Sequence, residues 1–331
     1  MKNDTQSIIV VGMHRSGTSA LTGALQCLGV NLGGRLYSRH RVINDKGYFE
    51  HAGIADTNDE ALAAMGSSWD SILPHEERFQ ESKKLLPYAK KIAKHIRKDF
   101  LGSRLWAVKD PRVCRLLPWW LEILSSLRVE PCFLFIVRSP FAVYQSLRKR
   151  DGFSADKAYL LWLLHYLEAE RWSRGKPRTF VDFDLFLEKP IDALIRVEQE
   201  LGVSYPRPVA KASKDLAAFL DAPLRHHRDA EIPNESSEIA LLARDVYLEF
   251  TRVARIYSTR PCEPYAIVMD EFMQHLKSIQ ESFPQVLVEH IRSSEKARGK
   301  AQLTLWRLVR SWSWYTGKPV RFFERLMGRD V

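Results

Sequence analysis

The stretch that decides the fold is Ile8-Ile9-Val10-Val11 followed by Gly12-Met13-His14-Arg15-Ser16-Gly17-Thr18-Ser19. The apolar run predicts a buried strand, and residues 20–25 continue the chain at helical spacing. A strand that enters a glycine-bearing turn and then a helix points backbone N–H groups and a helix N-terminus at one place, where phosphate or sulfate binds. The sequence therefore predicts a phosphate-binding loop.

This loop lacks the lysine of the version that cleaves ATP and GTP, which reads G-x-x-x-x-G-K-[ST]. The glycines match at Gly12 and Gly17, but Thr18 takes the lysine position, and Arg15 is the cation that replaces it. A P-loop kinase or NTPase, which would bind ATP or GTP tightly with magnesium, is for this reason the less favoured interpretation. A non-catalytic scaffold that keeps the fold is the other alternative.

Residues 15–19 resemble the 5′-phosphosulfate loop of sulfotransferases that use 3′-phosphoadenosine 5′-phosphosulfate (PAPS), where a basic residue, Ser and Gly precede two hydroxyl residues. A second match follows the apolar run 131–137, because Arg138 and Ser146 stand eight positions apart. In the family this pair holds the 3′-phosphate. The chemistry suits it, since a guanidinium binds phosphate oxygens as a planar fork and a hydroxyl adds another donor.

The resemblance implies a set of nucleotide-binding residues and no metal. The binding residues it implies are His14, Arg15, Ser16, Gly17, Thr18, Ser19, Arg138 and Ser146. Thr18 and Ser19 are expected at the 5′-phosphate. His14 either approaches the sulfuryl group or packs within the protein. The donor is PAPS, the product is PAP, and the acceptor is a hydroxyl or, as a less favoured choice, an amine.

Lys109 follows the predicted strand 105–108 within Lys109-Asp110-Pro111-Arg112. Many sulfotransferases have a lysine at this strand end, near the transferring group, so the resemblance implies that Lys109 and Arg15 are catalytic. Cytosolic family members carry a catalytic histidine where this chain has Pro111. The motif instead resembles bacterial sulfotransferases, with Asp110 expected to hold Lys109 or Arg112 in place.

The proton acceptor must therefore lie elsewhere, and Glu50 is the first candidate and His51 the second. Some bacterial sulfotransferases use a glutamate in this region. A glutamate acts as a base near neutral pH when burial raises its pKa. Two other roles for Glu50 stay open, a helix cap and a pair with a surface lysine.

The predicted fold is α/β, a P-loop-type three-layer fold with a central parallel sheet and a helical C-terminal region. Apolar strand candidates lie near 7–12, 105–108, 131–137 and 178–183 with helical stretches between them. Ligands bind beyond the carboxyl ends of such strands, so the motifs should meet in one crevice. We expect a sulfotransferase domain over 1–230, with a helical insertion at about 54–104, and a helical region over 231–331.

The composition of the 331 residues agrees with a globular cytoplasmic protein. Four cysteines without a Cys-x-x-Cys spacing argue against a disulfide framework and a zinc site. The sequence shows no secretory signal and no apolar run of spanning length. A net charge of +10 favours anionic partners, but no nucleic-acid motif accompanies it, and a polyanionic nucleotide also needs positive charge.

The region beyond 204 is predicted to be helical over 236–258 and 265–298, with Pro284 interrupting the second helix. The family's C-terminal Arg-Lys-Gly segment is missing, and the Arg225–Arg228 cluster is its candidate substitute. From 289 onward ten Lys and Arg oppose four acids, with six aromatic side chains interleaved. Such a tail contacts an anionic membrane at the inner face, packs on the catalytic domain or joins a second subunit.

Among acceptors, a glycan is favoured over a lipid-linked sugar, a polyketide or a small alcohol. The resemblance thus implies a bacterial-type, PAPS-dependent sulfotransferase that acts on a hydroxyl.

Overall fold

The computed structural model describes residues 5–37, 47–220, 237–255 and 263–316, with backbone alone for 263–264 and 306–316. Its centre is a parallel sheet in the order β2-β1-β3-β4. The strands are β1 (Gln6–Val11), β2 (Leu105–Lys109), β3 (Pro131–Val137) and β4 (Arg178–Asp182). The predicted strands and the predicted α/β class with a parallel sheet are therefore confirmed.

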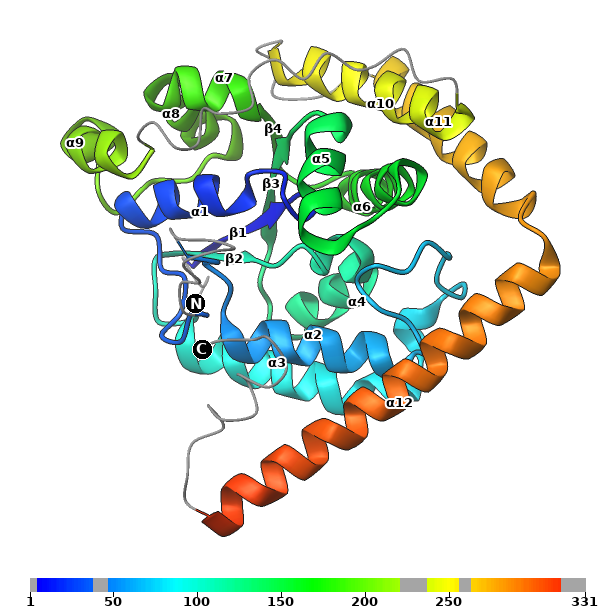
Figure 1. Cartoon of the computed structure of the whole chain (residues 1–331). Coiled ribbons are helices and arrows are strands. Elements are labelled where there is room, and N and C mark those ends of the chain that lie inside the picture. The colour runs from blue at the N-terminus through cyan, green and yellow to red at the C-terminus, as the bar shows by residue number, and fades with distance from the viewer. Residues whose placement is uncertain (1–4, 38–46, 221–236, 256–262, 317–331) are drawn as a thin grey trace.

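The strands are nearly continuous apolar runs because both faces of the sheet are covered. Ile9 and Val11 pack into the core on one face, and Ile8 and Val10 pack into a second core on the other face. Helices lie over both faces, which gives the three predicted layers (Figure 1).

One face carries α1 (Thr18–Cys27), α7 (Phe183–Glu188), α8 (Pro190–Leu201) and α9 (Val209–Phe219). The other carries α2 (Ala52–Ala64), α3 (Leu86–Asp99), α4 (Val113–Ser126), α5 (Pro140–Asp151), α6 (Ala155–Ser173), α10 (Glu238–Arg255) and α11 (Glu263–Glu281). Two short 3₁₀ helices, Phe79–Glu81 and Lys83–Leu85, lead into α3. The segment 54–104 thus contains most of α2, the two 3₁₀ helices and α3, and its Lys90, Lys94 and Lys98 are exposed. That this segment is an insertion stays a prediction.

The helix α12 (Gln285–Thr316) starts directly after Pro284, where the sequence predicts an interruption. It runs past residue 298, the predicted end, and packs across α2 (Figure 1). Over the described residues, no helix combines the length and the apolar character that a membrane span requires. The proposed boundary near residue 230 stays a prediction.

Strand register brings the motifs to one edge. Val10 of β1 pairs with Lys109, Val11 pairs with Phe135, and Val137 pairs with Asp182. The residues that follow these strand ends therefore lie at the carboxyl edge of the sheet, where α/β proteins bind ligands.

Candidate active site

The loop between β1 and α1 has the expected strand, turn and helix in sequence. Arg15 and Gly17 have φ angles of 69° and 88°, in the left-handed region. At Gly17 a Cβ atom would lie 2.2 Å from the ring of Phe183, so only glycine fits against that side chain. The helix starts at Thr18, and its first N–H groups therefore face the loop.

Arg15, Arg138 and Ser146 form one group of contacts, the arginine cluster. Arg15 Nε donates a hydrogen bond to Ser146 Oγ at 2.7 Å, and Arg138 Nη1 donates to the carbonyl of Arg15 at 2.9 Å. The Arg138 guanidinium lies 4.7 Å from the centre of the Phe183 ring. The structure thus brings together the loop and the pair that stands eight positions apart.

Burial leaves both guanidiniums of this cluster poorly solvated. Desolvation lowers the pKa of Arg138, and the charge of Arg15 lowers it further, while Asp184 opposes this in part. Desolvation also lowers the pKa of Arg15, followed by the charge of Arg150. The charge of Arg15 thus destabilises the Arg138 cation, an arrangement that a bound anion would stabilise.

Ser19, Lys109 and Glu50 form a second group, the lysine cluster. Lys109 Nζ donates to Ser19 Oγ at 3.2 Å, to the Tyr48 carbonyl at 2.8 Å and to Glu50 Oε1 at 2.7 Å. The side chains of Lys109 and Glu50 are only 3% and 9% exposed. A buried pair of this kind places a cation and a carboxylate beside the loop helix.

Glu50 is held by its backbone and by a second cation. The preceding residue, Phe49, has a φ of 54°, a conformation that costs energy for a bulky side chain. Arg112 Nη1 lies 3.5 Å from Glu50 Oε2. Glu50 therefore pairs with buried cations instead of the surface lysine considered from the sequence, and the helix cap belongs to its neighbour, His51.

Arg112 is the centre of a buried ionic network. It contacts Asp59 at 2.6 Å through Nε and Asp110 at 2.8 Å through Nη1. Asp110 also accepts from Asn58, which in turn accepts from Trp120 Nε1. Of the two partners expected for Asp110, the structure has Arg112.

Both ring nitrogens of His51 have structural partners. Nδ1 accepts from the N–H of Ile54 at 3.2 Å and so caps α2, while Nε2 lies 3.0 Å from Asp99 Oδ2. Because Nδ1 accepts, Nε2 carries the proton and donates to Asp99. Burial lowers the pKa of His51 despite this partner.

His51, His95 and Asp99 also form a group whose donor atoms lie within 4.8 Å of one another. In the tautomer above, His51 Nε2 has no lone pair for a metal ion. Burial, followed by the charge of His51, lowers the pKa of His95. Lys94 and Lys98 lower it further, and a metal cation there would meet the repulsion of these two lysines. The contact between His51 and Asp99 therefore joins the start of α2 to the end of α3.

His14 is partly buried in the loop, and its imidazole is neutral near pH 7. Desolvation, followed by the charges of Arg112 and Arg150, holds its pKa well below the ordinary value. Its ring centre lies 4.4 Å from that of Trp69, and Nε2 has no hydrogen-bond partner among the described residues. Of the two roles considered for His14, this packing is the one that the contacts describe, and contact with a ligand stays a prediction.

Sequence reasoning missed Tyr48, Phe183 and Trp69 as parts of the site. The Tyr48 carbonyl accepts from both Ser19 and Lys109, a backbone role that no residue type announces. Phe183 is the last residue of the predicted strand 178–183, and Trp69 lies in the predicted insertion at about 54–104. A large aromatic residue beside an acidic turn was the signal available for Phe183.

Some predicted features lie outside the described part of the chain. These are the Arg225–Arg228 cluster and the side chains of the aromatic tail from Trp306 onward.

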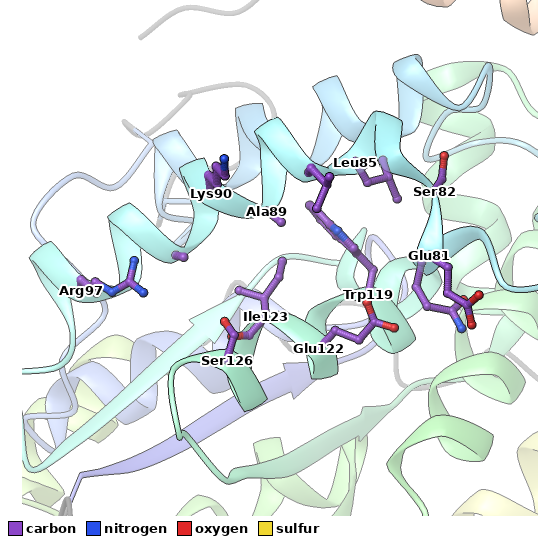
Figure 2. A pocket seen from close by; sticks show the side chains of 13 residues that line it. Glu81, Ser82, Leu85, Ala89, Lys90, Arg97, Trp119, Glu122, Ile123 and Ser126 are labelled. Atoms are coloured by element: carbon purple, nitrogen blue, oxygen red, sulfur yellow. The ribbon is translucent and has the colours of Figure 1, made fainter.

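A separate groove of about 480 Å³ lies between α3 and α4 (Figure 2). Leu85 and Ala89 line it from the α3 side, Trp119 and Ile123 line it from α4, and Glu81 and Glu122 are its acidic lining residues. Burial, together with the charge of Glu81, raises the pKa of Glu122. None of the predicted site residues lines this groove.

The fold and the loop define an α/β protein with an anion-binding type of turn at the carboxyl edge of a parallel sheet. No model of a protein family matches the chain, and no curated protein matches it. Among solved structures it is similar to the sulfotransferase domain of the olefin synthase of Synechococcus PCC 7002. The two share 14% identity over 85% of this chain and 96% of that one, with a TM-score of 0.39.

Proposed function

We propose that this chain is a sulfotransferase that moves the sulfuryl group of PAPS to an acceptor hydroxyl. One observation carries the proposal: the arginine cluster and the lysine cluster both contact the same lysine-free loop, from β3 and β2 respectively. A nucleotide with phosphate groups at two positions needs two sets of cationic donors. An NTPase loop would instead direct its own lysine to the phosphates.

The donor set fits PAPS. Arg138 and Arg15 are desolvated guanidiniums with lowered pKa values, and Ser146 adds a hydroxyl to them. Guanidinium forks and hydroxyls are the groups that bind phosphate most specifically. The loop N–H groups and the first turn of α1 provide neutral donors at the other end.

Each residue of the clusters receives a role from its position. Arg138 and Ser146 hold the 3′-phosphate, and Arg15 joins them because its Nε faces Ser146. The loop amides, Thr18 and Ser19 hold the 5′-phosphate.

PAPS supplies the activated sulfuryl group, whose bond from sulfur to the 5′-phosphate oxygen breaks as the acceptor oxygen bonds to sulfur. Lys109 stabilises the charge that grows on the bridging oxygen, so that PAP leaves as an anion. Glu50, 2.7 Å from Lys109, takes the proton of the acceptor hydroxyl. We favour Glu50 over His51 because the one lone pair of the neutral His51 ring, on Nδ1, already accepts from Ile54. The carboxylate oxygens of Glu50 have further lone pairs besides those that face Lys109 and Arg112.

The test is calorimetric titration with PAP, ATP and GTP, each with and without magnesium. We expect PAP to bind without magnesium and to exceed ATP in affinity by about 30-fold or more, the scale of one lost contact to a desolvated charge. Tight, magnesium-dependent binding of ATP or GTP together with absent PAP binding would support the kinase or NTPase alternative. PAP binding without turnover in a screen of glycans, lipid-linked sugars and small alcohols with labelled PAPS would support the scaffold.

A further inference from the structure

The loop over residues 65–73, called here the Trp69 loop, connects the end of α2 with the segment before α3. Trp69 lies between the phosphate-binding loop and α5. Its ring centre is 4.4 Å from His14 and 5.9 Å from Phe153, and the Arg150 guanidinium lies 5.3 Å from its ring. A shift of this loop would therefore change the contact between Trp69 and His14, which lies in the middle of the phosphate-binding loop.

The Trp69 loop is held from outside by the C-terminal helices. Arg298 of α12 pairs with Asp70 at 3.0 Å and also donates to Ser68. Glu295 accepts from Ser71 at 3.0 Å, and Gln280 of α11 donates to the Ile72 carbonyl at 2.8 Å. These contacts bracket Trp69 on both sides in the sequence.

Close backbone packing fixes α12 against the start of the same loop. At Gly299 a Cβ atom would lie 2.7 Å from the carbonyl oxygen of Ala63, in the last turn of α2. Lys296 of α12 likewise lies beside Gly66, just after the end of α2. Glycine at 299 therefore allows α12 to approach closely enough for Arg298 and Glu295 to reach the loop.

The catalytic domain holds the loop from inside. Arg115 of α4 donates to the carbonyls of Ser71 and Leu73, both at 2.9 Å. Lys157 of α6 pairs with Asp70 at 3.0 Å. Asp70 is thus shared between α6 and α12, which makes it the joint between the domain and the C-terminal helix.

We propose that α12 positions the candidate site by fixing the Trp69 loop, so that Trp69 holds His14 and the phosphate-binding loop in place. Trp69, Arg298 and Gly299 are positioning residues in this scheme, because none of them needs to touch a ligand. The binding readout rests on the proposed function, since the probe is PAP.

The test compares α12 variants for PAP affinity by calorimetry. Arg298→Ala should weaken PAP binding about two- to fivefold, the range for removing one partly exposed ion pair. Gly299→Leu, which forces α12 away from α2, should weaken it more. Arg292→Ala, an exposed residue of α12, is the matched control and should leave the affinity unchanged.

A double-variant cycle tests the route through Trp69. Trp69→Ala should weaken PAP binding by about tenfold, and Trp69→Phe should retain most of the affinity because it preserves the ring contact. Arg298→Ala added to Trp69→Ala should have no further effect. Additive losses, or an unchanged affinity in both Arg298→Ala and Gly299→Leu, would overturn the proposal.

Hydrogen exchange separates this proposal from the proposed function. Without any ligand, Arg298→Ala and Gly299→Leu should speed exchange in residues 12–17 and 65–73, and Arg292→Ala should not. If the wild-type chain fails to bind PAP, the proposed function is wrong, and the exchange result still decides the role of α12. Unchanged exchange in residues 12–17 would contradict the positioning role.

Discussion

Two arginines near the same sheet edge, the buried Arg112 and the partly buried Arg138, have opposite electrostatic surroundings. Arg112 contacts the carboxylates of Asp59, Asp110 and Glu50, and these charges raise its pKa well above the ordinary value despite burial. Arg138 donates to a backbone carbonyl and lies on the Phe183 ring, and burial lowers its pKa.

The difference separates a structural cation from a binding cation. A buried charge that is neutralised by several carboxylates holds elements together, and its loss leaves those carboxylates uncompensated. A buried charge with little compensation is costly to the fold, and such groups gather at functional sites. The comparison supports a structural role for Arg112 and an anion-binding role for Arg138.

The largest expected effect is on stability, from Arg112→Met. Because the buried carboxylates of Asp59 and Asp110 would lose the Arg112 cation, while Glu50 keeps Lys109, we expect a loss of about 3–5 kcal/mol in the free energy of unfolding. Arg138→Met should change it by less than about 1 kcal/mol, since it removes a desolvated charge with little compensation. Urea unfolding of both variants is the measurement, and equal losses would break the comparison.

Arg138→Met should instead weaken PAP binding by about 2–5 kcal/mol, the scale for truncating one partner of a desolvated charge pair. Adenosine 5′-phosphosulfate, which lacks the 3′-phosphate, should bind both proteins alike. Arg148→Met, an exposed arginine on the same helix as Ser146, is the control. Unchanged PAP affinity in Arg138→Met would remove the 3′-phosphate assignment.

Glu50→Gln should lower turnover by about 100-fold or more, a general-base effect, and leave PAP affinity nearly intact. The measurement is sulfuryl transfer from labelled PAPS to an acceptor found in the screen. Normal turnover would instead make His51 the leading candidate, and His51→Gln would then be compared in the same assay.

The smallest expected effect concerns acid stability. Burial lowers the pKa of His165 to about 3, so the unfolded chain binds the proton more readily than the folded chain. Stability is therefore full above the unfolded pKa near 6.5 and falls as the pH drops toward 3. When the pH falls from 7 to 5.5, the free energy of unfolding measured with urea should decrease by roughly 1 kcal/mol less in His165→Met than in the wild type. Equal losses would mean that His165 is not the group that titrates.

The sequence predicted the strands, the loop and the convergence at the sheet edge because these features are written in short segments. The apolar run 131–137 forms a buried strand, and Gly17 takes a left-handed backbone conformation. Both follow from the residue types within a few positions. It did not predict the Tyr48 carbonyl under Lys109 or the contact of Trp69 with His14. Both arise where segments far apart in the chain meet.

The sequence by itself determined a parallel α/β sheet with a phosphate-type loop, through hydrophobic runs and turn chemistry that act over a few residues. Only the tertiary structure decided which cations are neutralised. Arg112 meets Asp59 across 53 positions of the chain, and Arg138 meets the Arg15 carbonyl across 123. Charge compensation depends on distances in space, and those are set by how the helices pack on the sheet.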